Sequence, residues 1–210
     1  MKLKKAFKDT LPIFISYFSL SFSFGVLAVN QGLNPYLAIL MSIVIYSGSL
    51  QFLLLTMYQK FSLFDIFITS ILLNFRQFFY SLTFLDRYKN SLYKIFALTD
   101  ETFAILSNKK IDSKYELYVS ILNHIYWITG TISGVIFIHY IDFKLKGLDF
   151  ILIALFVVIL VEDFLKTKNF FPIILGVFSY SIFQIIGLEN SLILSIIFAF
   201  FTITIRKSYA

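Results

Sequence analysis

Long apolar runs separated by short polar connections make up almost the whole chain. A helix needs about 20 mostly apolar residues to cross the hydrocarbon core of a bilayer. Runs of this kind predict spans at Leu11–Val29, Tyr36–Tyr58, Phe61–Leu82, Tyr115–Ile138, Leu148–Leu165, Phe170–Leu188 and Ser191–Ile205. We therefore expect an all-α, polytopic helical membrane protein with about seven transmembrane helices.

An eighth apolar piece, Tyr93–Ser107, is short and carries an acidic pair, Asp100-Glu101. It is consistent with a short crossing, a re-entrant segment or an interfacial helix. We expect a single transmembrane domain over residues 1–210. Residues 11–107 and 115–205 show a faint similarity. It indicates either a weak internal repeat, since transporters often arise from duplicated halves, or a chance likeness between apolar segments.

The composition supports a membrane protein. Of the 210 residues, 59% are hydrophobic and 14% are charged, whereas a soluble domain is near half apolar and about a quarter charged. The chain has no cysteine, which excludes disulfides and thiolate metal sites, and only two histidines, His124 and His139. We expect no metal site and no cofactor. The net charge of +6 is interpreted as basic cytoplasmic loops and not as nucleic-acid binding.

The distribution of basic residues favours cytoplasmic termini. If Tyr93–Ser107 crosses, twelve basic residues lie inside and five outside, with Arg76 within a span. This is the direction that the positive-inside rule predicts. The weak point is Phe84–Lys94, which is basic for an outside loop. If Tyr93–Ser107 does not cross, Phe61–Leu82 must be the broken element that keeps both basic flanks inside.

Arg76 lies deep inside the predicted span Phe61–Leu82. A guanidinium at this depth costs about 3 kcal/mol on insertion scales, and such charges usually face a partner or a watery cavity. Asp65 is roughly 16 Å away along the helix. Asp100 and Glu101 are the remaining acids in an apolar setting. They lie about 100° apart on a helix, so we expect only one, Asp100, to meet Arg76, with Glu101 facing the helix terminus and water.

Several predicted spans carry polar residues at helical spacing, which places them on one face. These sets are Ser16, Ser19 and Ser23; Ser42, Tyr46 and Ser49, with Gln51 nearby; Ser70, Asn74, Gln77 and Ser81, with Arg76, Tyr80 and Thr83 on the next stripe; and Asn123, Trp127, Gly130 and Gly134. Packing between helices explains most single members, and a small-xxx-small pair such as Gly130 and Gly134 favours close helix contact. We interpret His124 as a core histidine in preference to a residue of a proton relay.

Two positions favour breaks in helices. Ser47-Gly48-Ser49 interrupts the run Tyr36–Tyr58, and Thr99 is an N-cap candidate followed by acids. Broken helices expose backbone groups that bind substrates and ions in transporters.

At this point the chain resembles the AzlC family, the large subunit of branched-chain amino-acid exporters. The matching elements run in order along the chain. They are Ser23-Phe24-Gly25, Tyr46-Ser47-Gly48-Ser49-Leu50-Gln51-Phe52, Asn74-Phe75-Arg76, Leu98-Thr99-Asp100-Glu101-Thr102-Phe103, Trp127 with Gly130, Thr131 and Gly134, and Gly147-Leu148-Asp149-Phe150. One departure is Gln77, where the family usually has histidine.

The resemblance implies secondary active export of leucine, isoleucine, valine and, as a further candidate, methionine from a bacterial cytoplasmic membrane. It also implies a small hydrophobic AzlD-type partner subunit. The expected substrate-binding residues are Tyr46, Ser47, Gly48, Ser49, Gln51, Asn74, Arg76 and Trp127. The expected coupling or gating residues are Arg76, Asp100, Glu101 and His124.

Three other readings compete with this one. The first is a transporter of another small amphipathic solute, and the second is a membrane assembly subunit without substrate. The third, a membrane enzyme, is disfavoured because the sequence has no Gly-x-Ser-x-Gly or His-Glu-x-x-His motif. No nucleotide-binding motif is present either, so we expect no ATP hydrolysis and no catalytic residues.

Overall fold

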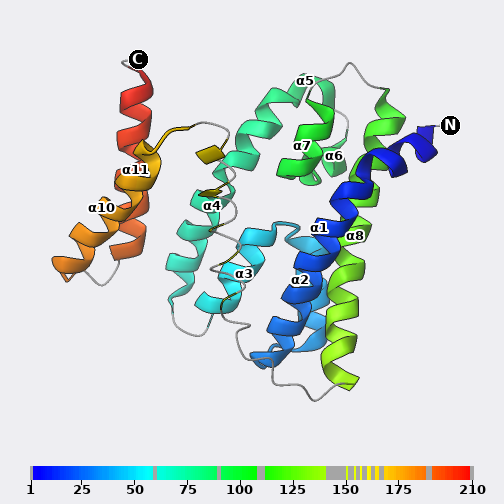
Figure 1. The fold of residues 1–210 in the computed structure, drawn as a ribbon, viewed down its shortest axis with the longest axis horizontal. Coiled ribbons are helices and arrows are strands. Elements are labelled where there is room, and N and C mark those ends of the chain that lie inside the picture. Colours follow the sequence, from blue (N-terminus) through cyan, green and yellow to red (C-terminus); the bar gives the residue numbers. More distant parts are fainter. Residues whose placement is uncertain are drawn as a thin grey trace. The chain divides into compact units, whose positions relative to one another are not determined.

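The computed structural model describes residues 2–58, 61–88, 91–107, 112–140, 168–187 and 191–208, with scattered positions between 150 and 165. Its helices are α1 (Lys2–Asn30), α2 (Pro35–Val44), α3 (Gly48–Met57), α4 (Leu63–Thr83), α5 (Leu85–Tyr88), α6 (Leu92–Phe96), α7 (Asp100–Leu106), α8 (Ser113–Tyr140), α10 (Phe171–Ile185) and α11 (Ser191–Ser208). Figure 1 shows them as a ribbon. The described part contains no strand, so the predicted all-α class is confirmed there.

The chain forms two compact units. The first comprises residues 1–60 and 73–152, and the second comprises residues 61–72 and 153–210, so the division falls inside α4. Every residue predicted to bind substrate or to act in coupling belongs to the first unit. The two units do not follow the suggested repeat, and a single domain with a repeat of 11–107 in 115–205 stays a prediction.

Two long helices, α1 and α8, run parallel and side by side in the first unit (Figure 1). Close contact is possible because glycines face the partner backbone. A Cβ on Gly130 would lie 2.7 Å from the Phe18 carbonyl oxygen, and one on Gly134 would lie 2.1 Å from that of Phe22. The prediction that Gly130 and Gly134 pack against another helix is confirmed.

The predicted single span Tyr36–Tyr58 is wrong. The chain forms α2 and α3, separated by a bend at which Tyr46 has a left-handed φ of 31° and Ser47 is extended. Gln51 Nε2 donates to the Met41 carbonyl oxygen at 2.9 Å, and the Tyr58 hydroxyl donates to the Gln31 carbonyl at 3.4 Å. Both ends of this first broken element (α2–α3) therefore lie at the same end of α1.

Neither helix of α2–α3 is long enough to cross a bilayer by itself. Each helix has 10 residues, or about 15 Å, half of the hydrocarbon thickness. Pro35 starts α2 in the first-turn position where proline costs a helix least. The expected break near Ser47-Gly48-Ser49 is confirmed, with Gly48 opening α3.

The predicted span Phe61–Leu82 is a continuous helix, α4, of 21 residues. At a rise of 1.5 Å per residue it is roughly 31 Å long, enough to cross a bilayer. The sequence argument allowed this segment to be the broken one, and the structure places the break in α2–α3 instead.

The predicted piece Tyr93–Ser107 does not cross. It consists of α6, with 5 residues, and α7, with 7 residues, joined by a bend at Ala97–Thr99. Lys94 Nζ contacts Ser113 Oγ at 2.8 Å, and Arg87 NH1 reaches the Leu106 carbonyl oxygen at 3.5 Å. The second broken element (α6–α7) therefore starts and ends beside the beginning of α8.

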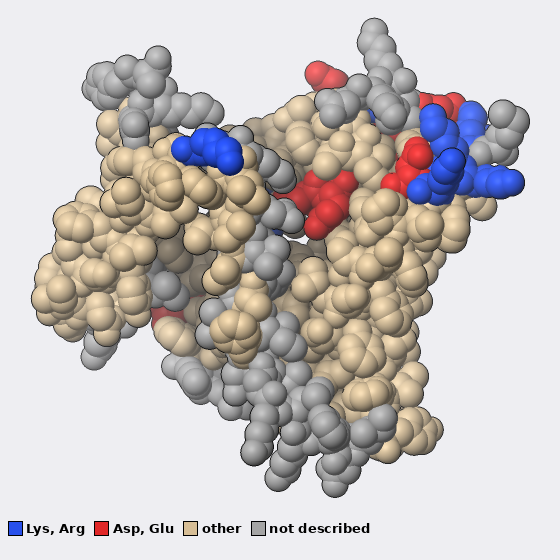
Figure 2. Space-filling view, in the orientation of Figure 1, with Lys and Arg blue, Asp and Glu red and all other residues tan. Residues whose placement is uncertain are grey.

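The N-terminus lies at this same end. Lys2 Nζ forms an ion pair with Asp112 Oδ2 at 2.6 Å, and Lys and Arg side chains gather near the N-terminus in Figure 2. The assignment of Arg87 and Lys94 to the face opposite the N-terminus is therefore wrong. Because α2–α3 and α6–α7 both turn back, the basic flanks of the second element stay beside the basic N-terminus.

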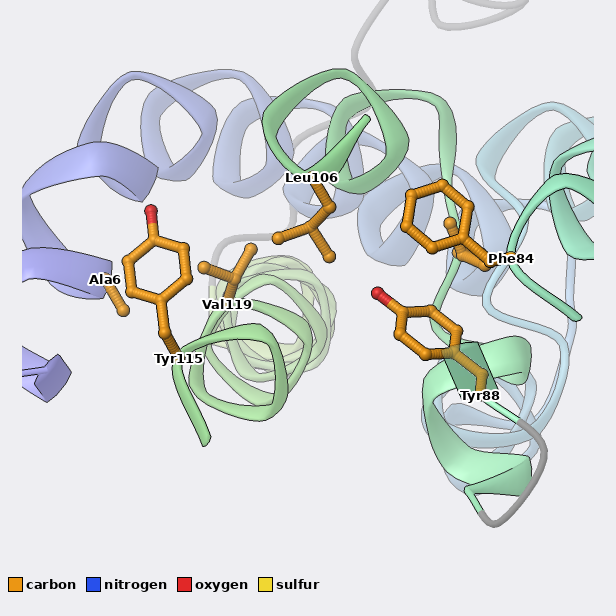
Figure 3. Packing of buried hydrophobic residues seen from close by; sticks show 7 residues of the cluster. Ala6, Phe84, Tyr88, Leu106, Tyr115 and Val119 are labelled. Atoms are coloured by element: carbon orange, nitrogen blue, oxygen red, sulfur yellow. The ribbon is translucent and has the colours of Figure 1, made fainter. Parts of the chain in front are cut away.

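A buried apolar cluster holds the base of the second broken element. It consists of Ala6, Phe84, Tyr88, Leu98, Leu106, Tyr115 and Val119. Figure 3 shows Phe84 and Tyr88 on one side of Leu106, and Val119, Tyr115 and Ala6 on the other. The cluster joins α1, α5, α7 and α8, so the base of this element is packed firmly against the two long helices.

The second unit contains α10 and α11, which confirm helices within the predicted spans Phe170–Leu188 and Ser191–Ile205. The two helices contact each other through Phe183 and Phe198, whose ring centroids are 6.0 Å apart. The predicted span Leu148–Leu165 lies largely outside the described residues. Among the described helices, α1 and α8 meet both the length and the hydropathy expected of a helix that crosses a membrane. A total of seven spans stays a prediction.

Candidate functional site

The bends of the two broken elements meet beside the middle of α8. The Tyr46 ring lies 4.3 Å from the His124 ring and 5.9 Å from the Phe96 ring, measured between centroids. Phe96 ends α6, and Tyr46 lies in the bend between α2 and α3. Two segments that enter from opposite ends of the first unit therefore bring interrupted backbone and polar side chains to one place.

Arg76 on α4 brings a positive charge to the point where the two bends meet. Its NH1 forms an ion pair with Asp100 Oδ2 at 2.7 Å, and its NH2 donates to Ser49 Oγ at 3.3 Å. It therefore connects the first turn of α3 to the first residue of α7. Arg76 Nε and Asp100 Oδ1 are buried atoms without a hydrogen-bond partner in the described structure.

Asp100 and Glu101 point in different directions, as neighbouring residues on a helix must. Asp100 faces Arg76, as the sequence argument expected. Glu101 does not face the helix terminus and water as expected, because its Oε2 accepts a 2.5 Å hydrogen bond from the Tyr17 hydroxyl. Thr99 is the N-cap of α7, and its Oγ1 accepts from the Thr102 backbone N–H at 3.3 Å.

The beginning of α3 is organised by two further contacts. Ser47 donates its hydroxyl hydrogen to Asn74 Oδ1 at 2.7 Å, and Trp127 Nε1 donates to Gln51 Oε1 at 3.0 Å. Gly48 lies against the indole, since a Cβ there would be 2.6 Å from Trp127 Cη2. Tyr46, Ser47, Gly48, Ser49, Gln51, Asn74, Arg76 and Trp127 are thus brought together as predicted, and their role in substrate binding stays a prediction.

His124 joins the same group from α8. Its Nδ1 is 3.2 Å from the Tyr93 hydroxyl, and its ring packs on Tyr46. This is the surrounding expected of a core histidine, and its predicted coupling role is untested.

Tyr17 is the residue that sequence reasoning missed. Its hydroxyl donates to Glu101 and lies 2.6 Å from Thr99 Oγ1, and its ring packs edge-on against Tyr46 and Trp127. It contacts both broken elements from α1. The serine set Ser16, Ser19 and Ser23 pointed to another face, and Ser16 and Ser19 are exposed.

The signal for Tyr17 was present in the sequence. Tyr17, Ser21 and Gly25 recur every four residues, and all three are buried. That spacing defines the α1 face that contacts α8.

A second charged group lies at the base of α6–α7, away from the bends. Glu116, 1% exposed, forms ion pairs with Lys94 at 3.0 Å and with Arg87. We call these three residues the basal charge cluster. The neighbouring pair Lys2–Asp112 is exposed, and the Lys2 ammonium holds the pKa of Asp112 below its usual range. Within the described residues no group of three or more His, Cys, Asp or Glu side chains could hold a metal ion.

The model of the AzlC protein family matches residues 12–141. These residues include every element that forms the site, from α1 to α8. The chain belongs to the AzlC family. The resemblance seen in the motifs is therefore confirmed.

Relatives in several bacteria agree with this assignment. The branched-chain amino acid transport protein AzlC of Bacillus subtilis is 32% identical over 183 residues, which cover 82% of this chain and 72% of that protein. A membrane protein of Helicobacter pylori is 37% identical over 179 residues, covering 79% and 78%. The inner membrane protein YgaZ of Escherichia coli is 29% identical over 140 residues, covering 60% and 57%. No solved structure matches the chain. Together with the composition, these relatives identify a membrane protein.

Proposed function

We propose that this chain is a secondary active transporter that exports branched-chain amino acids across the bacterial cytoplasmic membrane. Leucine, isoleucine and valine are the expected substrates, with methionine as a further candidate. The relative in Bacillus subtilis is named a branched-chain amino acid transport protein, and this supports the substrate class.

The observation that carries the proposal is the ion pair between Arg76 and Asp100 at the meeting point of the bends. A scaffold protein has no need for an arginine at mid-helix depth in an apolar chain, where it costs about 3 kcal/mol or more. Arg76 would bind the substrate carboxylate through charge-assisted hydrogen bonds, which are the strong ones.

The surrounding residues have separate roles in this proposal. Tyr46, Ser49 and Gln51 would orient the head group, while Ser47, Gly48, Asn74 and Trp127 hold the first turn of α3 in place. Alternating access would move the broken elements relative to each other, as in other transporters with interrupted helices. Asp100, Glu101 and His124 are the candidates for coupling or gating, since carboxylates in membranes form proton relays.

The same proposal includes the orientation and the partner. The described basic residues Lys2, Lys4, Lys5, Lys8, Arg87, Lys94 and Lys114 belong to the end of the first unit where α1 and α8 begin. By the positive-inside rule this end would be cytoplasmic, and we propose that both termini lie there. A small hydrophobic AzlD-type subunit would complete the exporter.

Intracellular leucine, isoleucine and valine after a dipeptide feed test the export function. Cells lacking the gene should retain these amino acids longer than cells that express it. Equal retention in the two strains, with the protein present in the membrane, would contradict the proposal. Uptake or export of a different small amphipathic solute, or a role as an assembly subunit, would then remain.

A further inference from the structure

We propose that Arg76 and Asp100 together bind the zwitterionic head group of an α-amino acid, with its carboxylate on Arg76 and its ammonium on Asp100. This inference rests on the proposed transport of amino acids and makes it more specific. It requires that a substrate carry both charges on the head group. A fatty acid or an amine with the same side chain would not satisfy the site.

The ion pair is incompletely satisfied in a complementary way. Only one atom of each side chain is used in the contact between them, Arg76 NH1 with Asp100 Oδ2. Arg76 Nε is a buried donor without a hydrogen-bond partner, and Asp100 Oδ1 is a buried acceptor without one, although the Tyr80 hydroxyl lies near the Asp100 carboxylate. A buried polar atom without a partner is destabilising. The unmet donor on the cation calls for an acceptor, and the unmet acceptor on the anion calls for a donor.

The pair is also accessible. The exposed fractions of the two side chains are 36% for Arg76 and 37% for Asp100. The basal charge cluster differs in accessibility: Lys94 and Glu116 are buried, and Lys94 Nζ contacts both Glu116 and Ser113. That cluster is a packed structural contact, whereas both side chains of the Arg76–Asp100 pair are more than a third exposed.

Charge balance selects a zwitterion over either half of it. A ligand with only a carboxylate would take Arg76 from Asp100 and leave that carboxylate unpaired. A ligand with only an ammonium would leave Arg76 unpaired. Loss of one partner from a pair in a low dielectric is strongly unfavourable. An amino acid replaces one ion pair by two and leaves no charge alone.

The first turn of α3 supplies a second reason for the orientation. Ser47 is the N-cap of α3 but makes no side-chain cap, and its hydroxyl instead donates to Asn74 Oδ1. Helix N-termini favour negative charge, and Ser49 in this turn lies 3.3 Å from Arg76. The substrate carboxylate therefore belongs on the Arg76 side, facing α3, and the ammonium belongs beside the Asp100 carboxylate, whose full charge outweighs the opposing dipole of the short helix α7.

Competition for binding of radiolabelled leucine to the purified full-length chain in lipid nanodiscs tests the inference. The competitors are unlabelled leucine, 4-methylpentanoate, which lacks the ammonium, and 3-methylbutylamine, which lacks the carboxylate. All three have the same branched tail. We expect each half-ligand to compete about 10- to 100-fold more weakly than leucine, the factor expected for one charged hydrogen-bonded contact. Trp127, the single tryptophan, provides a fluorescence signal beside Gly48 for the same titrations.

The Asp100→Asn variant tests the assignment of the ammonium. It should lose the preference for leucine over 4-methylpentanoate, while the matched control Asp112→Asn, an exposed member of the Lys2 pair, keeps it. The inference is overturned if 4-methylpentanoate competes as well as leucine in the unmodified chain, or if Asp100→Asn preserves the preference. These outcomes are separate from failure of the proposed function, which the cellular retention experiment reports. A chain that exports leucine in cells but binds none when purified would also overturn it.

Discussion

At the scale of single residues, the shape of the Arg76 side chain matters as well as its charge. The guanidinium spans two elements, with NH1 on Asp100 and NH2 on Ser49. A planar fork can hold two such partners in fixed directions, whereas an ammonium is a compact point charge.

Arg76→Lys should reduce initial leucine efflux at least about tenfold, because the loss of one charge-assisted contact removes roughly 1.5–3 kcal/mol. Efflux from preloaded cells, normalised to the amount of protein in the membrane, measures this. Normal efflux in the lysine variant would mean that Arg76 acts only as a point charge.

The two neighbouring acids should respond differently. Asp100→Asn removes the partner of Arg76, so we expect efflux to fall at least about tenfold. Glu101→Gln retains an acceptor for the Tyr17 hydroxyl and should lose less than about threefold. The comparison uses efflux with and without an imposed pH gradient. Equal losses at equal protein levels would point to capping of α7 as their common role.

At the scale of elements, the basal charge cluster should stabilise the attachment of α6–α7 to α8. Glu116→Gln would leave Lys94, which is 5% exposed, without its carboxylate. Breaking a buried pair in this way costs about 3–5 kcal/mol. We expect a clear drop in the melting temperature of the purified protein. Asp112→Asn, which breaks an exposed pair, should leave it nearly unchanged, and equal effects of the two substitutions would contradict the prediction.

The close contact of α1 with α8 gives a second prediction at this scale. In Gly134→Ala the new Cβ would lie 2.1 Å from the Phe22 carbonyl oxygen. That oxygen belongs to the backbone of α1, which cannot rotate away as a side chain can. Overpacking of this kind costs about 1–3 kcal/mol, so thermal stability should fall. Gly176→Ala on α10 meets no atom within 4 Å and should be neutral or stabilising by about 0.5–1 kcal/mol. A neutral Gly134→Ala would show that the two helices can separate freely.

At the scale of the whole molecule, the two turned-back elements determine which segments share a membrane face. The chain has no native cysteine, so single cysteines can be labelled without background. Cysteines at Lys5, Asp86 and Asp112 should react with an impermeant maleimide from one face, because the contacts of Lys2, Arg87 and Glu116 join these segments. A cysteine at Asn30 should react from the other face. Labelling of Asp86→Cys and Lys5→Cys from opposite faces would contradict the fold.

Much of the molecule follows from local sequence. The limits of α1, α4 and α8 agree with the predicted runs to within a few residues except at the start of α1, because the length of an apolar run reports directly on burial in lipid or protein. Four further features could be predicted, since each depends on residue type and short spacing. They are the importance of Arg76 and the acidic pair, the break near Gly48, the cap at Thr99 and the membership of the AzlC family.

The tertiary structure decided what depends on contacts between distant residues. An apolar run of 23 residues such as Tyr36–Tyr58 has the same hydropathy whether it crosses or turns back, and only the contact of Tyr58 with Gln31 distinguishes the two. The partner of Glu101 is Tyr17, 84 residues away, and a pattern of neighbouring residues cannot predict a contact between positions so far apart in the chain. The apolar runs determine that the chain enters the membrane, whereas packing between its helices determines which segments turn back and which charges meet.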